Sequence, residues 1–244
     1  MKKSIKIVSF LVSLAIYIVA CADGGERDNP YDPYGVAYER HLSYDSLSYD
    51  NWIGDLVDSR DGQKYRIVKI GDTWWMAENL NYKADNSYCY NDNPENCEKF
   101  GRLYQWAAAN DLNESYNSKE VDASPYIEIQ GICPQEWSLP KKGDFESLYT
   151  YTDKNSDQIK SDNGWSRDYN GMDNYGMTIL PSGYRDRDGT YKDSSTKAIF
   201  WTTSEEGGGY AYSFSITYYV RTPSVDYDLK ERAFAVRCIR NPKD

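Results

Sequence analysis

The sequence contains a single histidine, His41, among its 244 residues. A Ser-His-Asp triad, a Cys-His pair and a histidine-ligated metal site all need histidine at the site itself. His41 lies in a segment that we interpret below as a linker. The sequence therefore excludes these three kinds of site from the folded domain, and we assign no catalytic and no metal-binding residue.

Basic residues are also scarce, with 28 Lys and Arg against 38 Asp and Glu and a formal net charge of −10. A surface this acidic repels phosphate backbones. We therefore expect no nucleic-acid partner.

The one long apolar run, residues 7–20, is too short for a membrane-spanning helix of about 20 residues. Three lysines precede it, as in a signal peptide. It ends in Ile18-Val19-Ala20-Cys21, which resembles the bacterial lipobox, in which the cysteine is lipidated and becomes the mature N-terminus. We expect a lipoprotein signal peptide over residues 1–21 and a lipid anchor on Cys21 that binds the membrane. The alternative is an ordinary signal peptide with an incidental cysteine.

Residue 22 is Ala, so the simplest signal for inner-membrane retention, an Asp at this position, is absent. We expect an outer-membrane lipoprotein of the cell envelope, exposed at the surface. Residues 22–55 are rich in Gly, Pro, Asp, Ser and Tyr without a helical period, which is typical of a flexible tether. The folded domain is then expected over residues 56–241.

Four cysteines remain in an exported chain, which favours two disulfides with three possible connectivities. Cys89 and Cys97 flank a turn-rich loop that a disulfide would close, which leaves Cys133 to pair with Cys238. A tetrathiolate zinc site is the alternative, but the sequence has no Cys-x-x-Cys motif.

Turn residues and hydrophobic periodicity predict short strands and two helices. A hairpin is expected where Gly71-Asp72 joins a β-branched run to Trp74-Trp75, whose side chains point to opposite faces. Helices are expected over residues 101–112 and 142–152. Further strands are expected over residues 177–180, 198–203, 210–218 and 232–239. The pattern predicts an α+β fold with two helices and short antiparallel strands, stabilised by disulfides.

A series of short motifs runs along the chain: Asp61–Tyr65, Trp75–Leu80, Gly101–Trp106, Gly131–Pro134, Leu139-Pro140, Leu180–Arg185, Phe200–Glu205 and Val236–Cys238. In this order they resemble the Fibrobacter succinogenes major paralogous domain, a family of exported bacterial domains. The resemblance implies a compact C-type-lectin-like fold, similar also to formylglycine-generating enzymes, and it brings no activity with it.

No cofactor is expected, although calcium stays an open alternative. The Glu-Pro-Asn, Gln-Pro-Asp and Trp-Asn-Asp motifs of calcium-dependent lectins are absent. Asp186-x-Asp188-Gly189 is half of a calcium loop, and a plain turn is the simpler interpretation. Glu78, Glu136, Glu205 and Glu206 leave room for a carboxylate-pair hydrolase. We instead expect Glu78 and Asn79 to bind backbone groups near the hairpin, and we expect no enzyme.

Tyrosine is unusually abundant, with 24 residues beside 7 Trp. Such side chains suit contact surfaces as well as sheet packing. We favour a non-catalytic binding module with polysaccharide as its candidate ligand. The alternative is a structural or protein-interaction domain of the cell envelope, and a hydrolase or formylglycine-generating enzyme ranks below both. The candidate ligand contacts, besides the Tyr-rich strands, are Trp74, Trp201, Tyr184 and Arg185.

Overall fold

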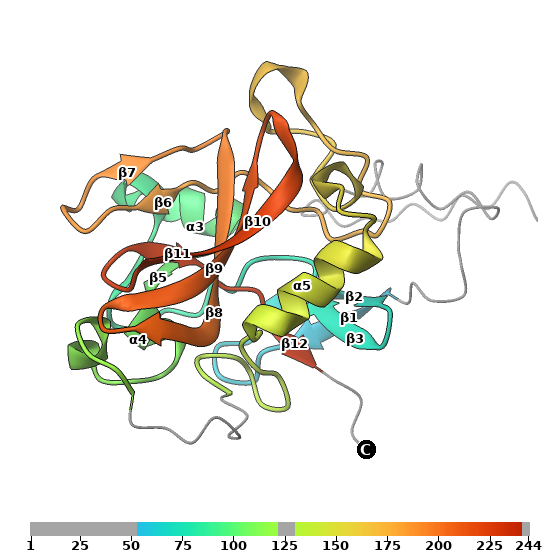
Figure 1. The fold of residues 1–244 in the computed structure, drawn as a ribbon. Coiled ribbons are helices and arrows are strands. Elements are labelled where there is room, and N and C mark those ends of the chain that lie inside the picture. The colour runs from blue at the N-terminus through green and yellow to red at the C-terminus, as the bar shows by residue number, and fades with distance from the viewer. Residues whose placement is uncertain (1–52, 122–129, 241–244) are drawn as a thin grey trace, which may run out of the picture. The chain divides into compact units, whose positions relative to one another are not determined.

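A computed structural model describes residues 53–121 and 130–240 (Figure 1). The expectations for the signal peptide, Cys21, His41 and most of the tether lie outside these residues. In the described part, β1 begins at Ile53, within the end of the predicted tether. No helix of this part is both long enough and apolar enough to cross a membrane.

The first sheet has four strands in the order β1-β2-β3-β12. The predicted hairpin is confirmed, because β2 and β3 pair antiparallel across Gly71-Asp72, with Ile70 opposite Thr73. Gly71 has φ of +59°, a left-handed conformation that suits glycine in such a tight turn. The strands are β1 (Ile53–Val57), β2 (Lys64–Ile70), β3 (Thr73–Met76) and β12 (Ile239–Arg240).

The second sheet follows the order β10-β9-β8-β11-β5-β4, with the short β6–β7 pair attached to β11. At its centre β11 and β8 are parallel, and the other neighbouring strands in this order are antiparallel. The strands are β4 (Ser87–Tyr88), β5 (Leu103–Gln105), β6 (Tyr184–Arg185), β7 (Tyr191–Lys192), β8 (Lys197–Gly207), β9 (Tyr210–Thr217), β10 (Val220–Leu229) and β11 (Ala233–Ala235).

Of the two predicted helices, only the second forms as expected. It is α5 (Lys142–Tyr151), which begins where the Asp144 carboxylate accepts a hydrogen bond from the Lys141 backbone N–H at 2.7 Å. The other α-helices are α3 (Pro94–Phe100) and α4 (Trp106–Ala109). Four short 3₁₀ segments complete the described elements: η1 (Tyr90–Asp92), η2 (Glu114–Asn117), η3 (Ser156–Gln158) and η4 (Ser166–Asp168).

The predicted α+β class with two helices is wrong, because the described residues form a mostly β structure with two sheets and short helices. Residues 103–105 of the first predicted helix pair with β11 as strand β5, which leaves only the four residues of α4 helical. Pairing with a distant strand overrides the local helical spacing there. Residues 177–180 were expected to form a strand and instead make one isolated bridge, from Ile179 to Lys160.

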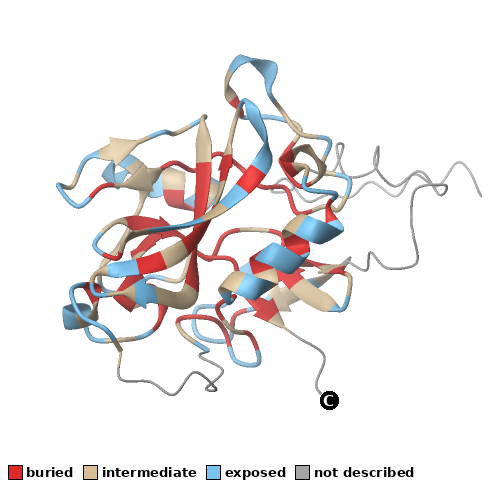
Figure 2. Cartoon of the chain, viewed as in Figure 1, coloured by how far each residue is buried: buried red, intermediate tan, exposed pale blue. Residues whose placement is uncertain are grey.

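The helix α5 packs on β8, β9 and β10, with its outer face exposed and its inner face buried (Figures 1 and 2). Phe145 of α5 stacks on Phe214 of β9, with ring centroids 4.5 Å apart. Both predicted disulfides are confirmed: Cys89–Cys97 joins the residue before η1 to α3, and Cys133–Cys238 joins two distant segments.

Candidate functional site

An exposed group of aromatic rings lies on β9 and β10, beyond the start of α5. Tyr212 and Tyr227 are directly opposite each other across these two strands. The next pair on the same face, Phe214 and Val225, packs into the core that includes Phe145 of α5. Because α5 begins at Lys142, it covers the phenylalanine and leaves the tyrosines uncovered.

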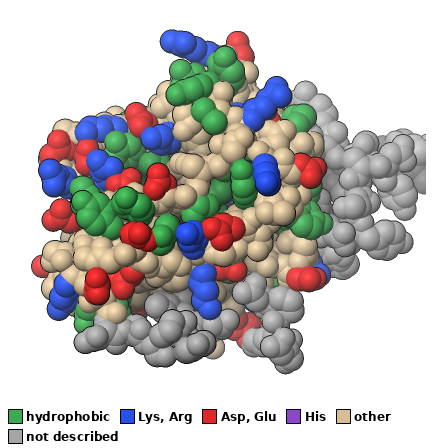
Figure 3. Space-filling view, viewed as in Figure 1, with side chains coloured by type: hydrophobic (Ala, Val, Ile, Leu, Met, Phe, Trp, Pro, Cys, Tyr) green, Lys and Arg blue, Asp and Glu red, His purple; other side chains and the backbone are tan. Residues whose placement is uncertain are grey.

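Three rings form this surface, which we call the tyrosine surface: Tyr210, Tyr212 and Tyr227. Tyr210 is 44% exposed and Tyr227 is 51% exposed, while Tyr212 is half-buried. The Tyr227 ring stands nearly perpendicular to both of the others, with centroids 5.9 Å from Tyr210 and 6.3 Å from Tyr212. On the face in view, Figure 3 shows hydrophobic side chains, tyrosine included, in separate patches among acidic and basic groups. Aromatic faces next to polar groups suit ligands with both apolar and hydroxylated sides.

Charged groups border the tyrosine surface. The Lys142 ammonium lies 4.0 Å from the centre of the Tyr212 ring, within the range of a cation–π contact. The Tyr212 hydroxyl donates a hydrogen bond to Glu206, which raises the pKa of Tyr212 above its ordinary value. A ligand at this surface would therefore find an ammonium and a carboxylate within a few ångströms of the rings.

A buried lysine fixes the β8–β9 turn beside the tyrosine surface. Lys230 has no exposed side-chain area, pairs with Glu205 and donates to the Gly208 carbonyl at 3.2 Å. Its ammonium also lies 4.2 Å from the Trp106 ring centre. Burying this charge requires such partners, so the turn that precedes Tyr210 is held in one position.

Two tryptophans were predicted to contact a ligand, and for Trp201 this prediction is wrong. Trp201 is fully buried, its Nε1 donates to the Tyr104 carbonyl at 2.8 Å, and its ring packs 4.3 Å from Phe234. It has no surface to offer a ligand. Trp74 is half-buried on β3, where Arg240 lies 5.8 Å from its ring, while its neighbour Trp75 is buried as the alternation predicts.

The predicted contacts Tyr184 and Arg185 lie on β6, away from Tyr212 in the sheet order. Both are half-buried. Tyr184 packs edge-on against Phe234 at 5.8 Å, and the Arg185 guanidinium lies 4.0 Å from the Tyr88 ring centre. The structure therefore does not bring these two residues together with the tyrosine surface.

The half calcium loop is a turn held by ion pairs. The Asp186 carboxylate binds Lys192 and, at 3.0 Å, Arg232. The hydrogen bond from Lys192 is the main reason that the pKa of Asp186 falls to about 2. Asp188 accepts from the Thr190 backbone N–H at 2.9 Å, as in an Asx-turn. The carboxylates that a calcium ion would need are therefore engaged by other protein groups.

The carboxylates considered for a hydrolase have separate structural partners. Glu78 accepts from the Arg66 backbone N–H at 2.8 Å, and Asn79 donates to the Phe100 carbonyl at 2.8 Å. The expectation that these two side chains bind backbone groups is thereby confirmed. Glu205 pairs with Lys230.

Tyr227, Lys142 and Glu206 are not among the ligand contacts predicted from the sequence. The alternation of Val225, Tyr227 and Leu229 is the signal that could have revealed β10 and the outward tyrosine. No sequence signal places Lys142 beside Tyr212, since only the packing of α5 on β9 brings them together.

The sequence model of the Fibrobacter succinogenes major domain matches residues 68–240. The chain belongs to this family. The matched residues lie within the span predicted for the folded domain and include β9, β10 and the start of α5. No curated protein and no solved structure matches the chain.

Proposed function

We propose that the chain is a non-catalytic binding module, anchored by lipid to the bacterial cell envelope, that holds polysaccharide at the tyrosine surface. The observation that carries this proposal is the group of three contacting tyrosine rings, two of them largely exposed, beside Lys142 and Glu206. Sugar rings pair an apolar face with hydroxyls that donate and accept hydrogen bonds, and this mixture matches that chemistry.

The residues of the tyrosine surface also suit binding without catalysis. Glu206 is engaged by the Tyr212 hydroxyl and Glu205 by Lys230. A glycosidase needs two carboxyl groups facing each other across the scissile bond. These two carboxylates are instead used to position a ring and a turn.

The test is binding of the purified full chain, in mild detergent, to insoluble plant cell-wall polysaccharides and to a glycan array, with and without EDTA. We expect saturable binding that EDTA does not change. Tyr227→Ala should weaken it by up to about tenfold, since an aromatic contact of this kind contributes about 0.5–1.5 kcal/mol.

Tyr219→Ala is the matched control, because Tyr219 is 61% exposed at the other end of the same β-hairpin and makes no ring contact with the tyrosine surface. Equal loss in both variants would remove the assignment to the tyrosine surface. If no glycan binds, a protein partner in the envelope is favoured. If EDTA abolishes binding, the ligand is held through calcium.

A further inference from the structure

The disulfide between Cys89 and Cys97 follows β4, at the end of the second sheet opposite to β10. The Cα atoms of the two residues are 4.9 Å apart. Residues 91–95 between them are all exposed, Cys89 is half-buried and Cys97 is 5% exposed. Cys133 and Cys238, in contrast, are fully buried. The first disulfide is therefore the more accessible of the two, and Cys89 is its more accessible member.

The guanidinium of Arg102 faces both sulfur atoms of this disulfide. Its Nη1 donates to Cys97 Sγ at 3.4 Å and to Cys89 Sγ at 3.6 Å. Its other nitrogens are held by Ser87, because Nε donates to the Ser87 hydroxyl at 2.9 Å and Nη2 to the Ser87 carbonyl at 3.3 Å. The Ser87 hydroxyl in turn donates to the Ala84 carbonyl at 2.6 Å. These contacts position Nη1 on the sulfurs.

No carboxylate neutralises Arg102 in the part of the chain that the structure describes, where its hydrogen-bond acceptors are Ser87 and the two sulfurs. A disulfide sulfur is a weak acceptor, whereas a thiolate carries a full negative charge. The contact with Arg102 therefore becomes stronger when the disulfide is reduced. An interaction that strengthens on reduction stabilises the reduced state and makes the disulfide easier to reduce.

We infer that Cys89–Cys97 is a thiol-exchange site that accepts two electrons from a dithiol. A thiolate of the dithiol attacks Cys89 Sγ, the bond between the two sulfurs breaks, and Cys97 leaves as a thiolate beside Arg102. The second thiol of the dithiol then loses its proton and attacks the mixed disulfide, which releases Cys89 as a thiolate. The dithiol ends as a disulfide, the cysteine pair is reduced, and the protons of the dithiol pass to solvent or to the new thiolates.

Reduction of this pair releases one tie on the segment from η1 to α3 and leaves its other contacts in place. The Tyr191 hydroxyl of β7 donates a hydrogen bond to Asp92, and the Tyr191 ring lies 5.2 Å from the Tyr90 ring. The Asn93 side chain accepts from the Glu95 backbone N–H at the start of α3. None of these contacts needs the bond between the sulfurs, so we expect the reduced protein to stay folded.

The first test places the purified full chain, in mild detergent, in glutathione buffers of increasing reducing strength. Acid stops the exchange, and alkylation followed by peptide mass spectrometry counts the free thiols at each cysteine. Structural disulfides resist reduction by glutathione. We expect Cys89–Cys97 to be half reduced within this series while Cys133–Cys238 stays oxidised. If Cys89–Cys97 stays oxidised in every buffer, or if both disulfides are reduced together, the inference is overturned.

Arg102→Met removes the positive charge and keeps an unbranched side chain. We expect the equilibrium constant for reduction of Cys89–Cys97 to fall at least tenfold, which corresponds to about 30 mV. Arg102→Lys restores the charge and should recover part of this loss. A Met variant that is reduced as easily as the parent, or a Lys variant that behaves like the Met variant, would contradict stabilisation by charge. Cys133–Cys238 should stay oxidised in both variants, which reports that the domain is folded.

Arg185→Met is the matched control. Arg185 is also half-buried and lies 4.0 Å from the ring centre of Tyr88, the neighbour of Cys89, but it donates to neither sulfur. We expect its equilibrium constant to change less than threefold, and a change equal to that of Arg102→Met would remove Arg102 from the assignment. Tyr227→Ala should leave the exchange unchanged, so this inference and the polysaccharide proposal fail independently.

Discussion

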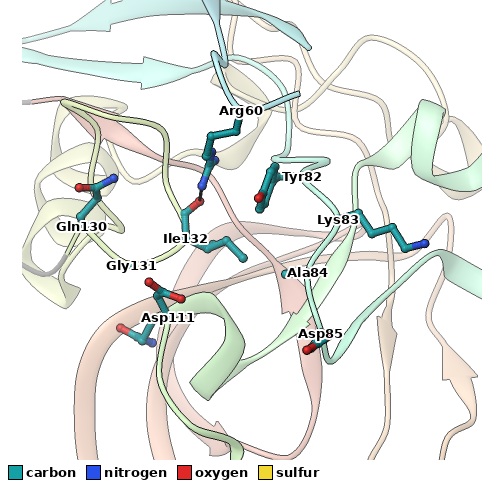
Figure 4. Close-up of a pocket in the computed structure, with 10 residues that line it drawn as sticks. Arg60, Tyr82, Lys83, Ala84, Asp85, Asp111, Gln130, Gly131 and Ile132 are labelled. Carbon is teal, nitrogen blue, oxygen red and sulfur yellow. Dashed lines mark hydrogen bonds between the residues drawn. The ribbon is translucent and has the colours of Figure 1, made fainter. Parts of the chain in front are cut away.

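Cys133 and Cys238 form a disulfide across 105 residues of sequence, with their Cα atoms 5.8 Å apart. Both residues are fully buried. Cys238 is next to Ile239 of β12, and Cys133 is next to Ile132, whose carbonyl accepts the Arg60 hydrogen bond. The bond therefore connects the end of the domain to residues 130–132, which line a cavity of about 570 Å³ beside Arg60 and Tyr82 (Figure 4).

Replacing both members of this disulfide, Cys133→Ala with Cys238→Ala, should strongly lower the melting temperature. A closed loop of about 100 residues contributes roughly 4–5 kcal/mol in the chain-entropy account, or about 10 °C for a domain of this size. Cys89→Ala with Cys97→Ala is the control, since that disulfide spans only 8 residues. Scanning calorimetry under oxidising conditions should show the smaller loss for the control pair; the reverse order would contradict the argument.

Arg237→Met should destabilise the fold by about 3 kcal/mol or more. Arg237 is 2% exposed and donates to Asn79 Oδ1 at 2.7 Å and to the backbone carbonyls of Met76, Met177 and Thr178. Methionine would leave these buried acceptors without their donor. Urea unfolding should show a lower midpoint with an unchanged slope.

The control for Arg237 is Arg221→Met, because the Arg221 side chain is 80% exposed and pairs with Asp157 at the surface. Surface ion pairs of this kind contribute about 0–1 kcal/mol. A loss as large as that of Arg237→Met would show that arginine burial is not the cause.

The stability of the domain should fall between about pH 4 and pH 7 through Asp173. Burial raises the pKa of Asp173 to about 7. The hydrogen bonds that the carboxylate accepts from Thr178 lower the pKa, because they favour the ionised form, but burial has the larger effect. In this range the folded state holds a proton that the unfolded state has lost, so rising pH favours unfolding. The stabilisation from Asp173 is fully present below the pKa of aspartate in the unfolded chain. It is lost as the pH rises through the pKa of Asp173 in the folded state.

The expected slope from this group is about 1.4 kcal/mol per pH unit, the value for one proton. Asp173→Asn should flatten the profile by that amount, measured by urea unfolding at pH 5, 6 and 7. The charges of Arg66 and Arg237 favour the ionised form and are present in both proteins. Parallel profiles of variant and parent would refute the assignment to Asp173.

Gly131→Ala should destabilise the domain and distort the cavity that Gly131 lines. Gly131 has φ of +59°, and a Cβ there would lie 2.6 Å from the Ala109 carbonyl oxygen, which is too close for a carbon atom. We expect a loss of about 1–3 kcal/mol. Gly143→Ala is the matched substitution within α5, where a Cβ meets no atom within 4 Å; there alanine should stabilise the helix by about 0.5–1 kcal/mol. Thermal melts that rank the two variants in the opposite order would contradict this.

Local chemistry in the sequence determined the features that need few partners. Gly71-Asp72 predicted the turn between β2 and β3, because glycine relieves the strain of a left-handed φ. The spacing of Cys89 and Cys97 around a turn-rich loop predicted their bond and, by elimination, that of Cys133 with Cys238. Alternation over residues 210–218 predicted β9.

Contacts between distant segments decided the rest. Trp201 and Trp74 are the same residue type, so their side chains do not differ in polarity. Trp201 is enclosed by the Tyr104 carbonyl and the Phe234 ring, so its burial depends on residues far along the chain. Tyr210 is exposed for the converse reason: α5 begins at Lys142 and does not extend over it. Local residue chemistry therefore accounts for the turns, the disulfides and a tyrosine-bearing strand. Long-range packing sets which aromatic rings meet solvent, because exposure depends on what packs against each side chain.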